Sequence, residues 1–376
     1  MAQEYKNIGI IGAGASGCLC AYFLLKAGLD VTLFDYGTPL RTLLPTGGGR
    51  CNLAHAEYDF RELAKNYPRG EKFLYSVFSK FSTYDTIDLF KELGIDTYVQ
   101  DDQRIFPVSN SSKEVREKML NSIKPATFQK EKVIRITPSD NEVALKTDKA
   151  EYLFSDIIIA TGGGNPIDGI KNKTVPFTPS LVGLNTKEKY PSGIVINNVY
   201  NKDCNLDGNL LFTHFGISGP LAFKISSVKT KDAFPYTLIF DLYPSEFDFQ
   251  AELNLNPHKD IKNILSKHLP LNFVKLLLKD MAEIKAHKVD GKMRDTILEN
   301  IHNFKLTITG TNKGEETVTA GGYDLDEINP KTMESKIHSH VYFTGEILDI
   351  DGFCGGFNLQ NAWSTAFVAA QGIINQ

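Results

Sequence analysis

The sequence has few of the features that mark an exported, membrane-bound or nucleic-acid-binding protein. Its five cysteines are odd in number and form no C-x-x-C pair, which argues against a disulfide framework, a zinc ribbon and a dithiol redox centre. Forty-one Lys and Arg stand against 45 Asp and Glu, so the net charge of −4 lacks the basic excess that nucleic acids require. No apolar run is long enough to span a bilayer. These absences predict a cytoplasmic protein that has neither a membrane nor a nucleic-acid partner.

The length and the residue patterns predict an α/β protein with insertions. With 376 residues, of which 42% are hydrophobic and 23% charged, the composition is globular and allows two or three domains. Both ends of the chain show buried-strand and helix patterns, which indicates one Rossmann-type domain built from two separate segments. The predicted parts are residues 1–184 and 307–376 for that domain, 185–245 for an inserted β-barrel-like domain and 246–306 for a small helical segment.

A glycine pattern near the N-terminus predicts a dinucleotide-binding turn. Gly12-Ala13-Gly14-Ala15-Ser16-Gly17 follows an apolar strand, Asn7–Ile11, and opens a helix. In G-x-G-x-x-G the first glycine makes a tight turn, the second lets backbone N–H groups approach a pyrophosphate, and the third allows close packing of helix on strand. The helix N-terminus adds partial positive charge. Asp35 ends the next predicted strand and is expected to accept hydrogen bonds from an adenosine ribose.

Two further glycine-rich segments favour a flavin over a nicotinamide as the bound dinucleotide. In Thr46–Asn52, a run of glycines allows the backbone to come close to a ligand, and Arg50 is positioned to reach a phosphate. A β-meander over residues 130–154 leads into a strand that ends at Ala160, an arrangement analogous to that of large flavoproteins. The residues expected along the cofactor in these segments are Gly48, Gly49, Arg50, Cys51, Thr161, Gly162 and Gly163, with the backbone of Val133 at the adenine.

The third feature lies near the C-terminus. Gly345-Glu346 follows a predicted strand, where a carboxylate can bind ribityl or ribose hydroxyls. A helix that begins near Gly356-Phe357-Asn358-Leu359 can stabilise the negative charge of a reduced flavin through its N-terminus. Glu346 also forms an acidic cluster with Asp349 and Asp351, but their spacing does not fit a calcium loop, and no metal site is predicted.

No catalytic residue can be assigned from the pattern alone. Cys51 is either a redox-active thiol beside the flavin or a small residue packed against it, and the lack of a resolving cysteine nearby favours packing. His214 is either a proton donor at a substrate site or a structural histidine.

These motifs resemble those of bacterial flavoproteins classed as NAD(P)/FAD-dependent oxidoreductases, a group that includes aminoacetone-oxidase-like proteins and a bile-acid-pathway flavoprotein. The resemblance covers nearly the whole chain and implies bound FAD, a discontinuous FAD domain, an inserted barrel-like domain and a helical domain. Its C-terminal part is similar to fumarate-reductase-type flavoproteins, in which the Glu meets the ribityl chain. This chain departs from the family at Ala54-His55, where Thr-Asn is usual, and in a shorter segment after Gly163. The segments that carry the resemblance are 12–17, 47–52, 104–109, 160–163, 212–220, 332–336, 345–352 and 356–360.

The sequence therefore predicts an FAD-containing oxidoreductase that transfers hydride or electrons between a small organic substrate and the flavin. NAD(P)H is the expected diffusible donor, and it would bind without a Rossmann fingerprint of its own, because the sequence has no second G-x-G-x-x-G. One alternative is a flavin-bound regulatory or sensor protein without turnover. Another is RNA modification by a flavin enzyme, which the charge of −4 disfavours.

Overall fold

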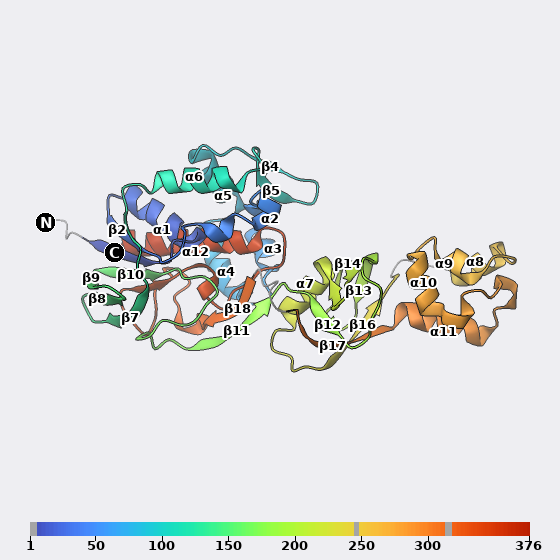
Figure 1. The fold of residues 1–376 in the computed structure, drawn as a ribbon. Helices are drawn as coiled ribbons and strands as arrows, with labels where there is room; N and C mark the ends of the chain where they lie inside the picture. Colours follow the sequence, from blue (N-terminus) through green and yellow to red (C-terminus); the bar gives the residue numbers. More distant parts are fainter. Residues whose placement is uncertain (1–5, 244–247, 313–317) are drawn as a thin grey trace. The chain divides into compact units, whose positions relative to one another are not determined.

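The computed structural model describes residues 6–243, 248–312 and 318–376 and divides the chain into two compact units (Figure 1). Unit 1 joins both ends of the chain, Met1–Thr178 and Val318–Gln376, and unit 2 is the segment between them, Pro179–Thr317. Unit 1 is the discontinuous Rossmann-type α/β domain that the sequence predicts, and unit 2 contains a closed six-stranded β-barrel with helices.

A parallel sheet forms the centre of unit 1, in the strand order β19-β10-β1-β2-β6. Strands β1, β10 and β19 are almost completely buried, because their sequences are nearly continuous runs of Ile and other apolar residues. Helices α1 (Ala15–Lys26) and α12 (Phe357–Ile374) pack along each other, α1 also against β1 and β2 and α12 against β19. The strands are β19 (Val341–Phe343), β10 (Asp156–Ile159), β1 (Asn7–Ile11), β2 (Asp30–Phe34) and β6 (Thr127–Gln129).

Smaller sheets and helices complete unit 1. The predicted meander is present as β7-β8-β9. The turn-rich segment after Gly163 contains a strand, β11, that the local pattern did not show, because its partner β18 lies far away in the sequence. The remaining elements are β3 (Ala54–His55), β4 (Thr97–Val99), β5 (Arg104–Pro107), β7 (Val133–Pro138), β8 (Val143–Thr147), β9 (Glu151–Phe154), β11 (Thr174–Ser180), β18 (Val318–Tyr323), α2 (Thr46–Gly49), α3 (Phe60–Ala64), α4 (Glu71–Phe78), α5 (Thr83–Glu92) and α6 (Ser112–Ser122).

In unit 2 the helical segment is inserted between two neighbouring strands of the barrel. The barrel order is β12-β15-β14-β13-β16-β17, and α8 to α11 lie between β16 and β17 in the sequence. Because β17 returns to the barrel, the contacts divide the chain at residue 317, whereas the sequence pattern placed that division at 306. The elements are β12 (Leu184–Thr186), β13 (Val195–Asn201), β14 (Leu206–Phe212), β15 (Gly216–Ser218), α7 (Gly219–Val228), β16 (Tyr236–Asp241), α8 (Phe249–Leu255), α9 (Ile261–Leu265), α10 (Leu271–Leu278), α11 (Gly291–His302) and β17 (Phe304–Thr311).

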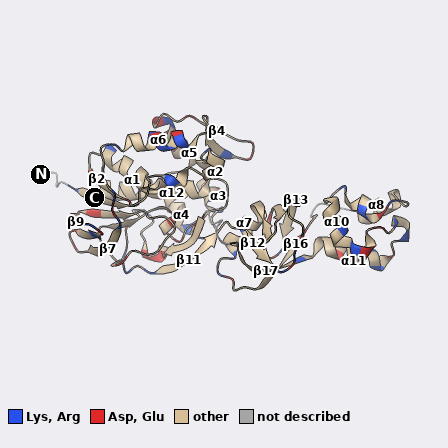
Figure 2. Ribbon diagram, in the orientation of Figure 1, with Lys and Arg blue, Asp and Glu red and all other residues tan. Residues whose placement is uncertain are grey.

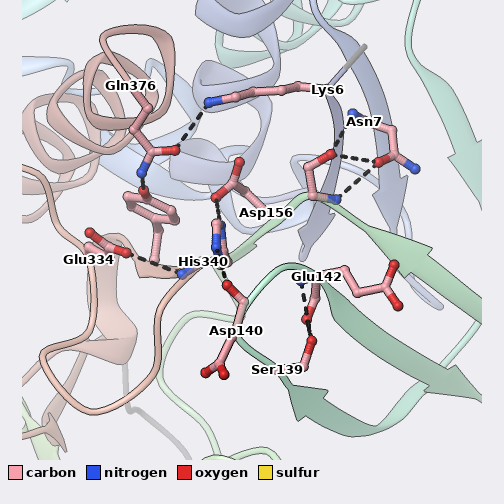
Figure 3. A network of polar contacts seen from close by, with 11 residues as sticks. Lys6, Asn7, Ser139, Asp140, Glu142, Asp156, Glu334, His340 and Gln376 are labelled. Carbon is pink, nitrogen blue, oxygen red and sulfur yellow. Dashed lines mark hydrogen bonds and ion pairs between the residues drawn. The ribbon is translucent and has the colours of Figure 1, made fainter. Parts of the chain in front are cut away.

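A polar network at the amino ends of β10 and β19 aligns these two strands (Figure 3). The Oδ1 atom of Asp156, the first residue of β10, lies 3.0 Å from Nδ1 of His340, which precedes β19. The other ring nitrogen of His340 donates to the carbonyl oxygen of Asp140 at 3.2 Å, and its backbone N–H donates to Glu334. The network connects the amino ends of β10 and β19, and the segments Thr161–Gly163 and Gly345-Glu346 follow the opposite ends of these strands.

The buried carboxyl of Asp156 makes the stability of the fold depend on pH. Burial raises its pKa, and His340 partly offsets the rise. A raised pKa favours the protonated acid in the folded state, so this contribution is present below the ordinary value of 3.8 and is lost as the pH rises through the folded value. We expect Asp156→Asn to keep or raise the free energy of unfolding at neutral pH and to flatten its pH dependence. Asp156→Ala, which removes the partner of His340, should lower the free energy of unfolding by about 1–3 kcal/mol.

Urea unfolding of the three proteins between acid and neutral pH measures both effects. If the free energy of unfolding falls equally in Asp156→Asn and Asp156→Ala at every pH, the ionised carboxylate itself stabilises the fold.

Candidate functional site

Four of the predicted cofactor segments meet at one edge of the central sheet. The glycine turn 12–17 follows β1, Asp35 follows β2, Thr161–Gly163 follows β10 and Gly345-Glu346 follows β19. These strands are parallel and adjacent, so the turns after them lie side by side at the carboxyl edge, which is where ligands bind in such sheets.

The turn after β1 leaves the N-terminus of α1 open. Gly12 has a φ of 103°, and a Cβ there would lie 2.3 Å from the carbonyl oxygen of Ala160. A Cβ on Gly17 would lie 1.9 Å from the carbonyl oxygen of Gly12, so helix and turn pack too closely for any side chain. Gly14 begins the helix without a side-chain cap, and a Cβ there would meet nothing within 4 Å. The uncapped N–H groups and the free space above them fit a pyrophosphate.

Asp35 holds this turn in place. Its Oδ2 accepts a hydrogen bond from the backbone N–H of Ala13 at 2.8 Å, and its Oδ1 accepts one from Gly37 at 2.6 Å. A carboxylate oxygen has two acceptor positions, so each oxygen keeps one for a ribose hydroxyl. The ribose contact predicted for Asp35 remains a proposal.

A second uncapped helix N-terminus belongs to α12. Gly356 precedes it with a φ of 102° and packs against the backbone of Ala54, where a Cβ would lie 2.4 Å from the carbonyl carbon. The side-chain amide of Asn358 accepts from the N–H of Gly352 and donates to its carbonyl, both at 2.8 Å. Asn358 therefore shapes the loop before the helix.

Glu346 connects two segments of the edge. Its Oε1 accepts a hydrogen bond from the backbone N–H of Thr319 at 2.7 Å, and the N–H of Gly163 is a further donor to the carboxylate. Burial raises the pKa of Glu346, and the charge of Asp351 adds to the rise. Gly345 packs on the side chain of Ser16, which brings the turn after β19 to the start of α1.

The glycine run 46–52 forms a tight turn. Gly47 and Gly48 adopt left-handed φ values of 58° and 69°, and a Cβ on Gly48 or Gly49 would point into open space. Arg50 donates to the carbonyl of Gly47 and to Gln100, and its guanidinium lies 4.0 Å from the centroid of the Phe106 ring. The phosphate contact predicted for Arg50 remains a proposal.

Cys51 is a packed neutral thiol. It is completely buried, and burial raises its pKa to about 12, so almost no thiolate exists at neutral pH. We expect Cys51→Ala to change turnover by less than about threefold, since an inert buried thiol acts only through packing. In the native protein iodoacetamide should modify the exposed Cys354 and spare Cys51, as peptide mass spectrometry can show. Rapid alkylation of Cys51 would contradict this assignment.

His55 is the titratable side chain that the sequence patterns did not single out for chemistry. It lies on β3, its Nδ1 is 3.2 Å from the carbonyl oxygen of Gly355, and its ring centroid lies 4.6 Å from that of Phe357. A carbonyl only accepts, so Nδ1 carries the proton and Nε2 is left available. Among the described residues Nε2 has no hydrogen-bond partner. Desolvation lowers the pKa of His55. The one sequence feature that pointed to His55 was the departure at Ala54-His55 from the Thr-Asn pair that is usual in the family.

Val133 and His214 remain predictions. Val133 opens β7 and pairs with Thr147, and no contact here tests its role at the adenine. His214 lies in unit 2, where its ring packs against Phe215. The described part of the chain contains no cluster of three metal-ligating side chains.

The site fits FAD. It combines two helix N-termini without side-chain caps, free space at Gly14, Gly48 and Gly49, and a carboxylate after β2 that holds the first turn. In addition, Oδ1 of the buried Asn52, next to Cys51, has no partner among the described residues, as expected for a polar atom that faces a ligand.

Known proteins with similar sequences match over their full length. A protein from Haemophilus influenzae named ribosomal RNA dihydrouridine synthase is 30% identical, with 100% of both chains covered. The protein of that name from Escherichia coli is 28% identical, with 97% of each chain covered. A 3-dehydro-bile acid delta(4,6)-reductase from Clostridium scindens is 27% identical over 97% of this chain and 98% of its own.

A solved flavocytochrome c3 fumarate reductase has 13% identity and a TM-score of 0.49, covering 98% of this chain and 78% of that one. None of the helices that the structure describes is both long and apolar enough to cross a membrane. The family model described as "HI0933-like protein Rossmann domain" matches residues 6–372. With that match and the geometry of the site, the chain belongs to the HI0933-like family of FAD-binding Rossmann proteins.

Proposed function

We propose that this protein is an FAD-dependent reductase that adds hydrogen across a C=C bond conjugated to a carbonyl group, with NAD(P)H as the electron donor. The observation that carries the proposal is that both activities named for its full-length relatives are reductions of this kind. Dihydrouridine is uridine reduced at the C5=C6 bond, which is conjugated to the C4 carbonyl. The delta(4,6) bonds of a 3-dehydro bile acid are conjugated to its 3-oxo group.

Uracil in ribosomal RNA is the substrate that we favour. Of the three full-length relatives described above, the two that are 30% and 28% identical carry that name. The overall charge of −4 is distributed unevenly: residues 179–317 hold 17 Lys and Arg against 16 Asp and Glu, and the rest of the chain holds 24 against 29. Unit 2 is therefore close to neutral and lacks the negative excess that would repel RNA. A small enone, the second candidate, is supported by the bile-acid relative.

The residues of unit 1 have separate tasks in such a reaction. The N-terminus of α1 binds the pyrophosphate, and Asp35 binds the adenosine ribose. Gly48, Gly49, Thr161, Gly162 and Glu346 line the cofactor, and the N-terminus of α12 at Phe357 faces the ring and favours negative charge there. Bound FAD supplies the two-electron chemistry by which hydride reaches the electron-poor β-carbon.

His55 supplies the proton. Reduction of the conjugated bond places hydride on the β-carbon and a proton on the α-carbon. The carbonyl of Gly355 holds the proton on Nδ1, so only the imidazolium carries a second proton, on Nε2, to give away. Since desolvation lowers the pKa of His55, this form becomes populated below the ordinary value of 6.5. Reduction should therefore accelerate as the pH falls through that region.

Anaerobic flavin spectroscopy tests the proposal in two steps. NADH or NADPH should bleach the flavin absorbance of the purified protein, and an acceptor of the correct class should restore it. Deproteinised ribosomal RNA and a steroidal 3-oxo-4,6-diene are compared as acceptors. If neither nucleotide bleaches the flavin, the protein is a sensor or an oxidase and the reductase proposal fails.

A further inference from the structure

One stretch of the inserted helical segment of unit 2 carries a basic excess, whereas the whole segment, residues 246–306, is close to neutral with ten Lys and Arg against nine Asp and Glu. Between Pro257 and Arg294 the sequence holds nine Lys and Arg against four Asp and Glu. Figure 2 shows basic residues along the helices of this segment. Its apolar residues, such as Phe273 and Ile297, join the core of the barrel, so the segment folds as part of unit 2 and its charges lie outside.

Two short stretches of this segment, residues 257–260 and 285–288, pair with each other, so their basic side chains lie close together. Asp260 and Lys285 form an antiparallel bridge, and the N–H groups of Ala286 and His287 donate to the carbonyls of Lys259 and Pro257 at 2.9 and 3.0 Å. We call the surface formed by residues 257–259 and 285–288 the basic edge. Its histidine rings, His258 and His287, are in edge contact with centroids 5.6 Å apart.

The lysines of the basic edge differ in their partners. Lys285 is paired with Asp260 at 2.7 Å, and the neighbouring Lys262 is paired with Glu283. Lys259 and Lys288 are exposed, and among the described residues no acidic side chain pairs with either. Lys259 acts on the nearby carboxylate of Glu252 without forming an ion pair with it. Two ammonium groups with no ion-pair partner among the described residues therefore lie on the same edge as two exposed imidazole rings.

This combination suits single-stranded RNA. Ammonium groups neutralise phosphates, and binding releases the counterions held there. Imidazole rings stack on bases that are not paired in a helix. His287 donates through Nδ1 to the carbonyl of Pro257 at 2.7 Å, which fixes the ring and leaves Nε2 for a base or phosphate.

We propose that the basic edge is an RNA-docking surface, with Lys259 and Lys288 on phosphates and the two histidine rings on exposed bases. The inference deepens the proposed function, on which it rests, by assigning the contact with ribosomal RNA to the inserted segment.

Binding of deproteinised ribosomal RNA to the full-length flavoprotein, measured against salt concentration, tests this surface. The double variant Lys259→Glu/Lys288→Glu should bind at least about tenfold more weakly and should show a salt slope smaller by roughly two. The control Lys187→Glu/Lys305→Glu makes the same charge change at exposed lysines of the barrel and should bind as the wild type does. Bleaching of the flavin by NADPH should be equal in all three proteins.

Equal weakening in both double variants would overturn the basic edge as a specific surface. Binding to anionic phospholipid vesicles that depends on Lys259 and Lys288, without binding to RNA, would also overturn it. In either case, reoxidation of the flavin by RNA or by the steroidal dienone still decides the proposed function independently.

Discussion

Replacing Gly14 with aspartate is expected to remove FAD while leaving the apoprotein as stable as before or slightly more stable. Gly14 begins α1 without a side-chain cap, its φ of −81° suits any residue, and a Cβ there meets nothing within 4 Å. Aspartate is a better N-cap than glycine by a few tenths of a kcal/mol. The same carboxylate would occupy the space proposed for the pyrophosphate and repel it. We expect FAD affinity to fall by roughly 100-fold or more, which is about 2.7 kcal/mol.

Fluorescence titration of apoprotein with FAD and thermal unfolding of the apoprotein measure the two opposite changes. Gly14→Asn is the matched control, because it caps the helix in the same way without the charge, and it should keep more affinity than Gly14→Asp. Unchanged FAD binding by Gly14→Asp would place the pyrophosphate elsewhere.

Replacing His55 with glutamine is expected to slow reduction of the organic substrate by about 100-fold or more, the usual contribution of a general acid. Glutamine can still donate to the carbonyl of Gly355, but it cannot deliver a titratable proton. Reduction of the flavin by NAD(P)H should be unchanged, because that half-reaction needs no proton at the α-carbon. The acceleration of substrate reduction below pH 6.5 should disappear.

The pH dependence separates this role from a structural one. The oxidised flavin spectrum of the wild type should shift as His55 titrates, and the shift should be absent from His55→Gln. The groups whose charges act on His55 are Glu57, Asp102 and Arg104, so Glu57→Gln should move the midpoint without removing it. If His55→Gln reduces the organic substrate as fast as the wild type and with the same pH profile, His55 is not the proton donor.

Much of the nucleotide domain could be predicted because its signals are local. The apolar run Asn7–Ile11, the glycine turn and the strand Asp30–Phe34 are contiguous, and each matches the structure within a residue or two. The closure of the barrel could not be predicted in the same way. Strand β17 pairs with β16 across the whole inserted helical segment, and no local pattern records such a pairing.

In the site, too, some features could be predicted from the sequence and others could not. Glycines were predictable, because a tight turn or close backbone approach restricts Gly12 and Gly17 to that residue type. Polar roles were harder to predict, because a side chain can bind either a ligand or the protein. Arg50 binds Gln100 and Gly47, and Asn358 binds Gly352, and neither partner could be inferred from spacing. His55 escaped notice because its position depends on Gly355, which is distant in sequence.

Nucleoside analysis of ribosomal RNA after a single turnover shows whether the reduced protein converts uridine to dihydrouridine. The protein is reduced anaerobically with NADPH and mixed with ribosomal RNA from a strain that lacks this protein. Flavin absorbance and mass spectrometry of the nucleosides then follow the reaction. We expect one dihydrouridine to form for each flavin that is reoxidised. The steroidal dienone serves as the comparison acceptor. Flavin that stays reduced with both acceptors and is reoxidised by oxygen alone would contradict a reductase of conjugated C=C bonds.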